Sequence, residues 1–174
     1  MKTLIVNCMG GPGAGKTTTS MELTAHLKWN GILAEYVHEY AKDLVWDKRT
    51  SMFDNQIYIF AKQHHSLFRL LNQVDVIVTD SPIILSAVYN KSHPHLNTAM
   101  IDEFKSFNNL NFFLHRTKAY VQAGRYQTED EAREVDSDVK IMLQNNKIPY
   151  ININAQEGVS IEMAHHVRTA LGLS

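Results

Sequence analysis

Short runs of β-branched and other apolar residues alternate along the chain with longer segments in which apolar positions recur every three or four residues. The short runs have the length and composition of buried strands, and the longer segments are typical of amphipathic helices. The predicted strands are Leu4–Met9, Ile32–His38, Val74–Thr79, Leu110–His115 and Tyr150–Asn154. The predicted helices are Lys16–Asn30, Met52–Asn72, Asn97–Asn108, Glu129–Asn145 and Ser160–Leu171. This alternation favours an α/β fold, in which a parallel sheet carries helices on both faces.

Two of these helix boundaries have a local chemical cause. Thr128 and Glu131 have the spacing of a capping box, in which a hydroxyl and a carboxylate bind backbone N–H groups of the first helical turn. This pair predicts a helix start at Glu129. Gly31 follows the periodic segment Lys16–Asn30 and is a natural helix end, because glycine readily adopts a positive φ.

The size of the chain predicts one domain. Its 174 residues contain no Gly/Ser-rich linker and no internal repeat, so we expect a single domain over residues 1–174. The apolar runs fall far short of the roughly 20 residues that span a membrane. The N-terminal run leads into a glycine-rich loop rather than a cleavage site. We therefore expect no membrane association.

Charge and cysteine content bear on the binding partners and the cellular compartment. The net charge of −1 gives no overall field that would favour nucleic acid. A single cysteine, Cys8, excludes an internal disulfide and suits the reducing cytoplasm, which would be the host cytoplasm for a phage-encoded chain. The sequence leaves the oligomeric state open, including a homodimer.

A glycine-rich segment joins the first predicted strand to the first predicted helix. Gly10, Gly15, Lys16 and Thr17 match the spacing G-x-x-x-x-G-K-[ST] in the strand and helix context that this motif requires. Backbone N–H groups in such a loop converge on an anion at the helix N-terminus, and the lysine contacts the β- and γ-phosphates of a nucleotide. The predicted nucleotide-binding residues here are Gly11, Pro12, Gly13, Ala14, Gly15, Lys16, Thr17 and Thr18.

A carboxylate follows the third predicted strand. Asp80 comes directly after the apolar run Val74–Thr79, where P-loop proteins place a group that organises Mg²⁺. The hydroxyl of Thr17 is a second oxygen ligand of the kind that Mg²⁺ prefers. We therefore predict that Thr17 and Asp80 hold Mg²⁺. A helix N-cap is the alternative interpretation of Asp80.

Three classes of P-loop protein share this loop. Motor ATPases commonly place a glutamate next to the strand-end aspartate, whereas Ser81 follows Asp80 here. GTPases recognise guanine through N-K-x-D, and neither Asn90-Lys91 nor Asn146-Lys147 continues to the required aspartate. A small kinase therefore fits best, and a regulatory ATPase module stays open as the alternative.

The second predicted strand ends near another carboxylate. Glu39 emerges at the edge of the sheet where parallel strands present ligand-binding residues. A carboxylate there can accept the proton of an attacking hydroxyl. We therefore predict a catalytic role for Glu39 beside Lys16 and Asp80. The alternative is a glutamate that stabilises the start of a helix.

An arginine-bearing lid is predicted over residues 116–136. Arginine side chains bind phosphoryl oxygens bidentately and stabilise transition-state charge. Arg116 and Arg125 are the main candidates in this segment. Arg133 is expected to pair with Glu129, four residues before it on the predicted helix.

The long predicted helix after Glu39 carries candidates for acceptor binding. Gln56 and Gln63 lie seven positions apart and share one helix face. A glutamine side chain can pair with a nucleobase through one donor and one acceptor, and Phe60 can stack on the base. Packing in the core or exposure on the surface is the alternative for each of these residues.

Three segments together resemble known P-loop kinases. They are GGPGAGKTTTSMELTAHL, HEYAKDL and VIVTDSP, which occupy residues 10–27, 38–44 and 76–82. The chain is similar to the nicotinamide-riboside kinase domain of the bifunctional bacterial NAD-biosynthesis regulator and to phage P-loop kinases, with deoxynucleoside and thymidylate kinases as wider relatives. The resemblance implies a three-layer P-loop kinase fold with strand order 2-3-1-4-5, and ATP with Mg²⁺ as the phosphate donor.

The resemblance also implies roles for individual residues. Glu39 maps to the catalytic glutamate of deoxynucleoside kinases, and Gln63 or Gln56 maps to their base-reading glutamine. Arg116 maps to the arginine that stacks on adenine in nucleotide kinases. One position departs from the pattern, because Ser81 follows Asp80 where deoxynucleoside kinases have arginine. That difference favours an acceptor other than an ordinary deoxynucleoside.

The acceptor implied by the resemblance is nucleoside-like, with two alternatives. One is 5-hydroxymethyluracil already in phage DNA, phosphorylated during thymidine hypermodification, and the other is a free nucleoside or mononucleotide. A DNA acceptor requires a groove with basic rims. The candidates for such rims are Lys42, Lys48, Arg49, Lys62 and Arg69.

Overall fold

The computed structural model describes residues 2–121, 123 and 127–173, and its centre is a parallel sheet of five strands. The strands follow the order β2-β3-β1-β4-β5, which confirms the predicted fold class and the implied strand order. They are β1 (Leu4–Met9), β2 (Ala34–Val37), β3 (Val76–Thr79), β4 (Asn108–His115) and β5 (Ile151–Asn154).

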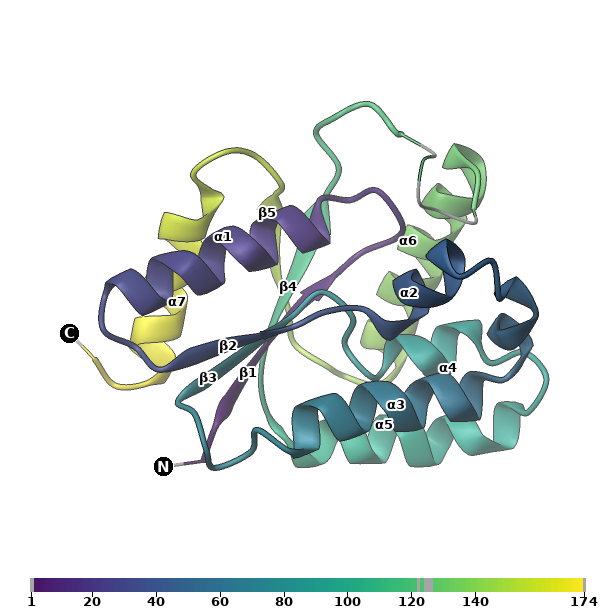
Figure 1. Ribbon diagram of the computed structural model, residues 1–174, viewed down its shortest axis with the longest axis horizontal. Coiled ribbons are helices and arrows are strands. Elements are labelled where there is room, and N and C mark those ends of the chain that lie inside the picture. The colour runs from purple at the N-terminus through teal and green to yellow at the C-terminus, as the bar shows by residue number, and fades with distance from the viewer. Residues whose placement is uncertain (1, 122, 124–126, 174) are drawn as a thin grey trace.

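Helices cover both faces of this sheet (Figure 1). They are α1 (Lys16–Trp29), α2 (Tyr40–Trp46), α3 (Gln56–Phe68), α4 (Leu85–Tyr89), α5 (Asn97–Ser106), α6 (Glu129–Asn145) and α7 (Val159–Ala170). Two short 3₁₀ helices, η1 (Thr50–Asp54) and η2 (Pro94–Leu96), lie in the connections. In Figure 1, α1 and α7 lie together on one side of the sheet, and the remaining helices lie on the other.

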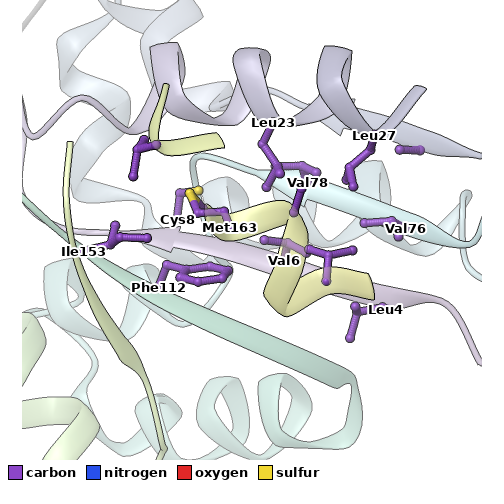
Figure 2. Close-up of a cluster of buried hydrophobic side chains, with 14 of the residues drawn as sticks. Leu4, Val6, Cys8, Leu23, Leu27, Val76, Val78, Phe112, Ile153 and Met163 are labelled. Carbon is purple, nitrogen blue, oxygen red and sulfur yellow. The ribbon is translucent and has the colours of Figure 1, made fainter. Parts of the chain in front are cut away.

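Alternation of side chains along β1 divides the core into two clusters. Leu4, Val6 and Cys8 face α1 and α7, where they pack with residues such as Leu23 and Met163 (Figure 2). Successive strand residues point to opposite faces of a sheet, so Ile5 and Met9 join the other cluster, beneath the helices of the second face. Both faces of β1 are therefore buried, as its continuous apolar sequence requires.

The predicted long helix over Met52–Asn72 is divided in the structure. Residues 50–54 form η1, and α3 begins only at Gln56. Asn55 is the reason, because its side-chain oxygen accepts a hydrogen bond from the backbone N–H of Tyr58 at 3.2 Å and caps α3. The helix therefore starts four residues later than its hydrophobic pattern suggests.

Both predicted helix boundaries are confirmed. Thr128 and Glu131 form the two reciprocal hydrogen bonds of a capping box at the start of α6. Gly31 has a φ of 77° just after Asn30, the C-cap of α1. The expected pair between Arg133 and Glu129 is also present, at 2.8 Å.

Strand register brings the candidate chemistry to one edge of the sheet. Thr79 in β3 is paired with Val37 in β2 and with Asn7 in β1. Glu39, Asp80 and Gly10 follow these strands within a few residues, so they emerge at the same edge. This is the edge at which open α/β sheets bind ligands. Among the described residues, no helix is long and apolar enough to cross a membrane.

Candidate active site

The glycine-rich loop between β1 and α1, residues 10–15, forms the floor of the site. Gly15 is the N-cap of α1 with a φ of 88°, a conformation that disfavours side chains. A Cβ at Gly15 would also lie 2.8 Å from the Cβ of Ala155. The ammonium of Lys16 donates to the carbonyl oxygens of Gly10 and Gly11 at 2.9 and 3.0 Å. The lysine side chain therefore lies over the loop, where the phosphates of a nucleotide are predicted to bind.

The carboxylate of Asp80 is buried beside this loop. Its Oδ2 accepts hydrogen bonds from the hydroxyl of Thr17 at 2.6 Å and from the phenol of Tyr36 at 2.8 Å. Its Oδ1 is also buried, and the described residues supply it with no hydrogen-bond partner. A buried carboxylate oxygen in this state favours a cation or a water ligand.

These oxygens fit a magnesium ion. Mg²⁺ usually binds through one or two carboxylates together with substrate phosphates and water, rather than in a cage built by protein alone. The described residues contain no cluster of three or more His, Cys, Asp or Glu side chains suited to a metal. Thr17 and Asp80 would hold the ion, which would neutralise phosphate charge when bound.

A cavity of about 420 Å³ opens next to the loop. Its described walls come from the loop itself, from α2, η1, α3 and α4, and from the segment before α6. They include the predicted residues Lys16, Thr17, Glu39 and Gln56. The cavity therefore joins the phosphate-binding loop to the predicted base and to one predicted acceptor-binding residue.

Glu39 is held at the entrance of α2. It is the N-cap residue of this helix, in an extended conformation, and it is half-buried in the cavity wall. Gln63 fixes the same junction from α3, because its Nε2 donates to the carbonyl of His38 and its Oε1 accepts from the N–H of Tyr40, both at 3.1 Å. The residues on either side of Glu39 are thus tied to a neighbouring helix.

This arrangement already engages Gln63, whose acceptor-binding role stays a prediction. The side chain is 2% exposed, and backbone groups already occupy both ends of its amide. Phe60 packs against the buried cluster beneath the sheet and stacks on His64. Neither residue belongs to the described cavity wall, whereas Gln56 does, with its Nε2 donating to the carbonyl of Phe53 at 2.7 Å.

Arg116 has two partners in the structure. Its side chain is 8% exposed, and the guanidinium donates to Asp136 at 2.9 Å and to the carbonyl of Pro12 at 2.8 Å. These contacts hold it beside the start of the loop, and its stacking on adenine stays a prediction. Arg125 lies outside the described residues, so its role stays a prediction. Ala123 and Gln127, from the same predicted lid, do line the cavity.

Two tyrosines at the site were not predicted from sequence. Tyr89 lines the cavity, Tyr36 binds Asp80, and Lys42, predicted only for the rim of a DNA groove, also lines the cavity. Burial raises the pKa of Tyr36 far above its ordinary value, and the negative charge of Asp80 adds to this shift. Burial raises the pKa of Tyr89 in the same direction. Both phenols therefore remain protonated hydrogen-bond donors at neutral pH.

Replacing Tyr36 with phenylalanine should destabilise the fold. The change removes one of the two hydrogen bonds to a buried carboxylate, and bonds of this kind contribute about 1.5 to 3 kcal/mol. We expect the free energy of unfolding, measured in urea, to fall by this amount. Tyr58→Phe is the control, because the phenol of Tyr58 pairs with the neutral phenol of Tyr40 instead of a carboxylate. Equal losses in the two variants would contradict the role of Tyr36.

The fold and the site together define a P-loop nucleotide-binding protein. The sequence matches the family described as AAA domain over residues 5–160, and the chain belongs to that family. Curated protein sequences give no match.

Solved kinase structures share the fold. A deoxyadenosine kinase from M. mycoides, solved with the products dCMP and dCDP, superposes with a TM-score of 0.61 at 15% identity, covering 97% of this chain and 100% of the kinase. The same enzyme with bound dATP gives 0.60 at 18% identity, covering 93% and 97%. A thymidylate kinase from Ehrlichia chaffeensis gives 0.60 at 14% identity, covering 99% and 100%.

Proposed function

We propose that the protein is an ATP-dependent kinase that transfers the γ-phosphate to a hydroxyl of a free nucleoside or mononucleotide. The observation that carries this proposal is the common cavity, whose wall contains Lys16 and Thr17 on the phosphate-binding side and Glu39 on another element. A donor site and a candidate base in one cavity are what phosphate transfer to a hydroxyl requires.

The transfer follows from the positions of these groups. Glu39 accepts the proton of the acceptor hydroxyl, whose oxygen forms a bond to the γ-phosphorus. The bond between that phosphorus and the oxygen bridging the β- and γ-phosphates breaks, and ADP leaves. Lys16 stabilises charge on the phosphate oxygens, and Asp80 with Thr17 would hold the Mg²⁺ that neutralises the rest.

The size of the cavity favours a small acceptor over a base within DNA. A volume of about 420 Å³ lies within the range of small-molecule pockets. Four helical elements surround the acceptor side. Of the five basic residues predicted to flank a DNA groove, Lys42 lines the cavity, and the other four lie outside its described wall. The nucleotides bound to the structurally similar deoxyadenosine kinase, dCMP, dCDP and dATP, agree with this choice.

A panel of acceptors tests this proposal. Release of ADP should be measured with ATP and Mg²⁺ in the presence of free nucleosides, mononucleotides, or DNA with unmodified or 5-hydroxymethylated pyrimidines. We expect a nucleoside or mononucleotide to raise ADP release well above the basal rate, with no stimulation by DNA. Stimulation by hydroxymethylated DNA alone would overturn the choice of a small acceptor. The absence of stimulation by any acceptor would favour a regulatory ATPase.

A further inference from the structure

Two charged side chains hold the outer part of the phosphate-binding loop. The carboxylate of Asp136, on α6, accepts the backbone N–H of Gly11 at its Oδ1 and the guanidinium of Arg116 at its Oδ2. The guanidinium also donates to the carbonyl of Pro12 at 2.8 Å. We propose that these two side chains form a clamp that sets the loop for ATP, and that Asp136 is a positioning residue for the phosphate donor.

The backbone of α6 approaches the loop closely at the same point. A Cβ at Gly11 would collide with the carbonyl oxygen of Ala132 and would lie 2.9 Å from Oδ1 of Asp136. Two independent observations, a side-chain hydrogen bond and a backbone contact, thus seat Gly11 against α6. The start of the loop has little freedom to move away from this helix.

The clamp occupies backbone groups at one end of the loop only. It engages the N–H of Gly11 and the carbonyl of Pro12, near the start of the loop. The N–H groups at the other end of the loop, where α1 begins at Lys16, remain for the phosphates. Fixing one end of the loop in this way keeps those N–H groups directed at a single point, and pre-organised donors of this kind bind charge strongly.

Burial makes the two members of the clamp depend on each other. The side chain of Arg116 is 8% exposed and that of Asp136 is 22% exposed. The Nε of Arg116 is buried, and the described residues offer it no acceptor. Loss of the Asp136 charge would therefore leave a largely buried cation paired only with a carbonyl, which strongly favours rearrangement of the guanidinium.

The clamp also connects the loop to the predicted lid. Arg116 and Asp136 are the first and last residues of the segment expected to form it, residues 116–136. Both ends of that segment are thus fastened to the loop that holds the donor.

The direction in which ATP affinity changes when Asp136 loses its charge distinguishes a positioning role from a purely electrostatic one. The ligand ATP is an anion, so removal of a negative charge near its site should tighten binding if Asp136 acts only through its charge. A positioning role predicts weaker binding, because the loop loses its anchor. The two explanations therefore predict opposite changes in the dissociation constant for ATP.

The experiment measures ATP binding with Mg²⁺ and no acceptor, at a temperature well below the melting transition of every variant. We expect Asp136→Asn to raise the dissociation constant about tenfold, and Arg116→Lys to raise it less, because a lysine cannot bridge Asp136 and Pro12 with a planar fork. Asp138→Asn is the matched control, since this exposed residue of α6 pairs with Lys91 at the surface. It should change the dissociation constant less than twofold.

An unchanged or lower dissociation constant in Asp136→Asn would overturn the proposal. If that variant does not fold, Arg116→Lys decides the question by the same criterion. The inference rests on ATP as the donor, but it fails separately from the kinase proposal. If Asp136→Asn keeps normal ATP affinity and acceptors still stimulate turnover, the clamp proposal fails and the kinase proposal stands. If Asp136→Asn binds ATP more weakly but no acceptor stimulates the wild-type protein, the clamp proposal stands and the kinase proposal fails.

Discussion

Lys16→Ala is expected to reduce phosphate transfer by about 10²- to 10³-fold or more, the size of effect seen when one pre-organised charge-stabilising donor is removed. The ammonium of Lys16 lies over the loop, bound to the carbonyls of Gly10 and Gly11, and it lines the cavity where the phosphates are expected. Its removal leaves the developing negative charge on the γ-phosphate without its nearest lysine. The measurement is the initial rate of acceptor-dependent ADP formation at saturating acceptor.

Lys28→Ala is the control for this variant. Lys28 is on the same helix, and its ammonium pairs with Glu35 at the surface, 2.8 Å away. The free energy of unfolding should change little in either variant, because neither ammonium is deeply buried. Transfer at the wild-type rate by Lys16→Ala would show that the loop is not the donor site.

Glu39→Gln is expected to slow transfer by roughly 10²- to 10⁴-fold while ATP binding stays within about twofold, since general base catalysis contributes on this scale. The amide keeps the size of the side chain but cannot accept the proton of the hydroxyl. Asp43→Asn is the matched control, an acid-to-amide change on the same helix at an exposed residue that pairs with His38. The measurements are the rate at saturating substrates and the dissociation constant for ATP.

Two outcomes would contradict the role of Glu39. One is an equal loss of activity in Glu39→Gln and Asp43→Asn. The other is a loss of ATP binding in Glu39→Gln as large as the loss of transfer, because this would place the carboxylate at the donor instead of the acceptor.

Local patterns in the sequence predict most of the sheet and the donor side of the site. Leu4–Met9 is a run of apolar residues interrupted only by Asn7, with glycines after it, and this strand and the loop appear where the pattern places them. The bounds of α6 are also as predicted, because the capping box at Thr128 determines where the helix starts. In these segments the signal lies in adjacent residues, so no distant contact is needed to read it.

Two short helices are absent from the sequence prediction for physical reasons. In α4, Leu85, Ser86, Ala87 and Val88 are all buried, so the segment shows no polar face and no helical period. In α2 only seven residues follow Glu39, too few to display a repeat. Both helices line the cavity, so the sequence pattern does not predict these two parts of its wall.

Several side chains at the site have distant polar partners that no local pattern reveals. Gln63 has the right spacing for a cavity residue, but two backbone groups beside Glu39 satisfy its amide. Arg116 is attracted by Asp136, 20 residues away, and no pattern around either residue announces the pair. Tyr36 could have been suspected as a strand residue just before Glu39, but its bond to Asp80 depends on the pairing of β2 with β3.

The most direct test of the kinase proposal follows the phosphate itself. ATP labelled at the γ-phosphate is incubated with the protein, Mg²⁺ and a mixture of nucleosides and mononucleotides, and the labelled products are separated by chromatography. The proposed function predicts that the label appears in a phosphorylated nucleoside or nucleotide and that Glu39→Gln greatly reduces this product. Label found entirely as inorganic phosphate, at a rate that the acceptors do not change, would contradict it.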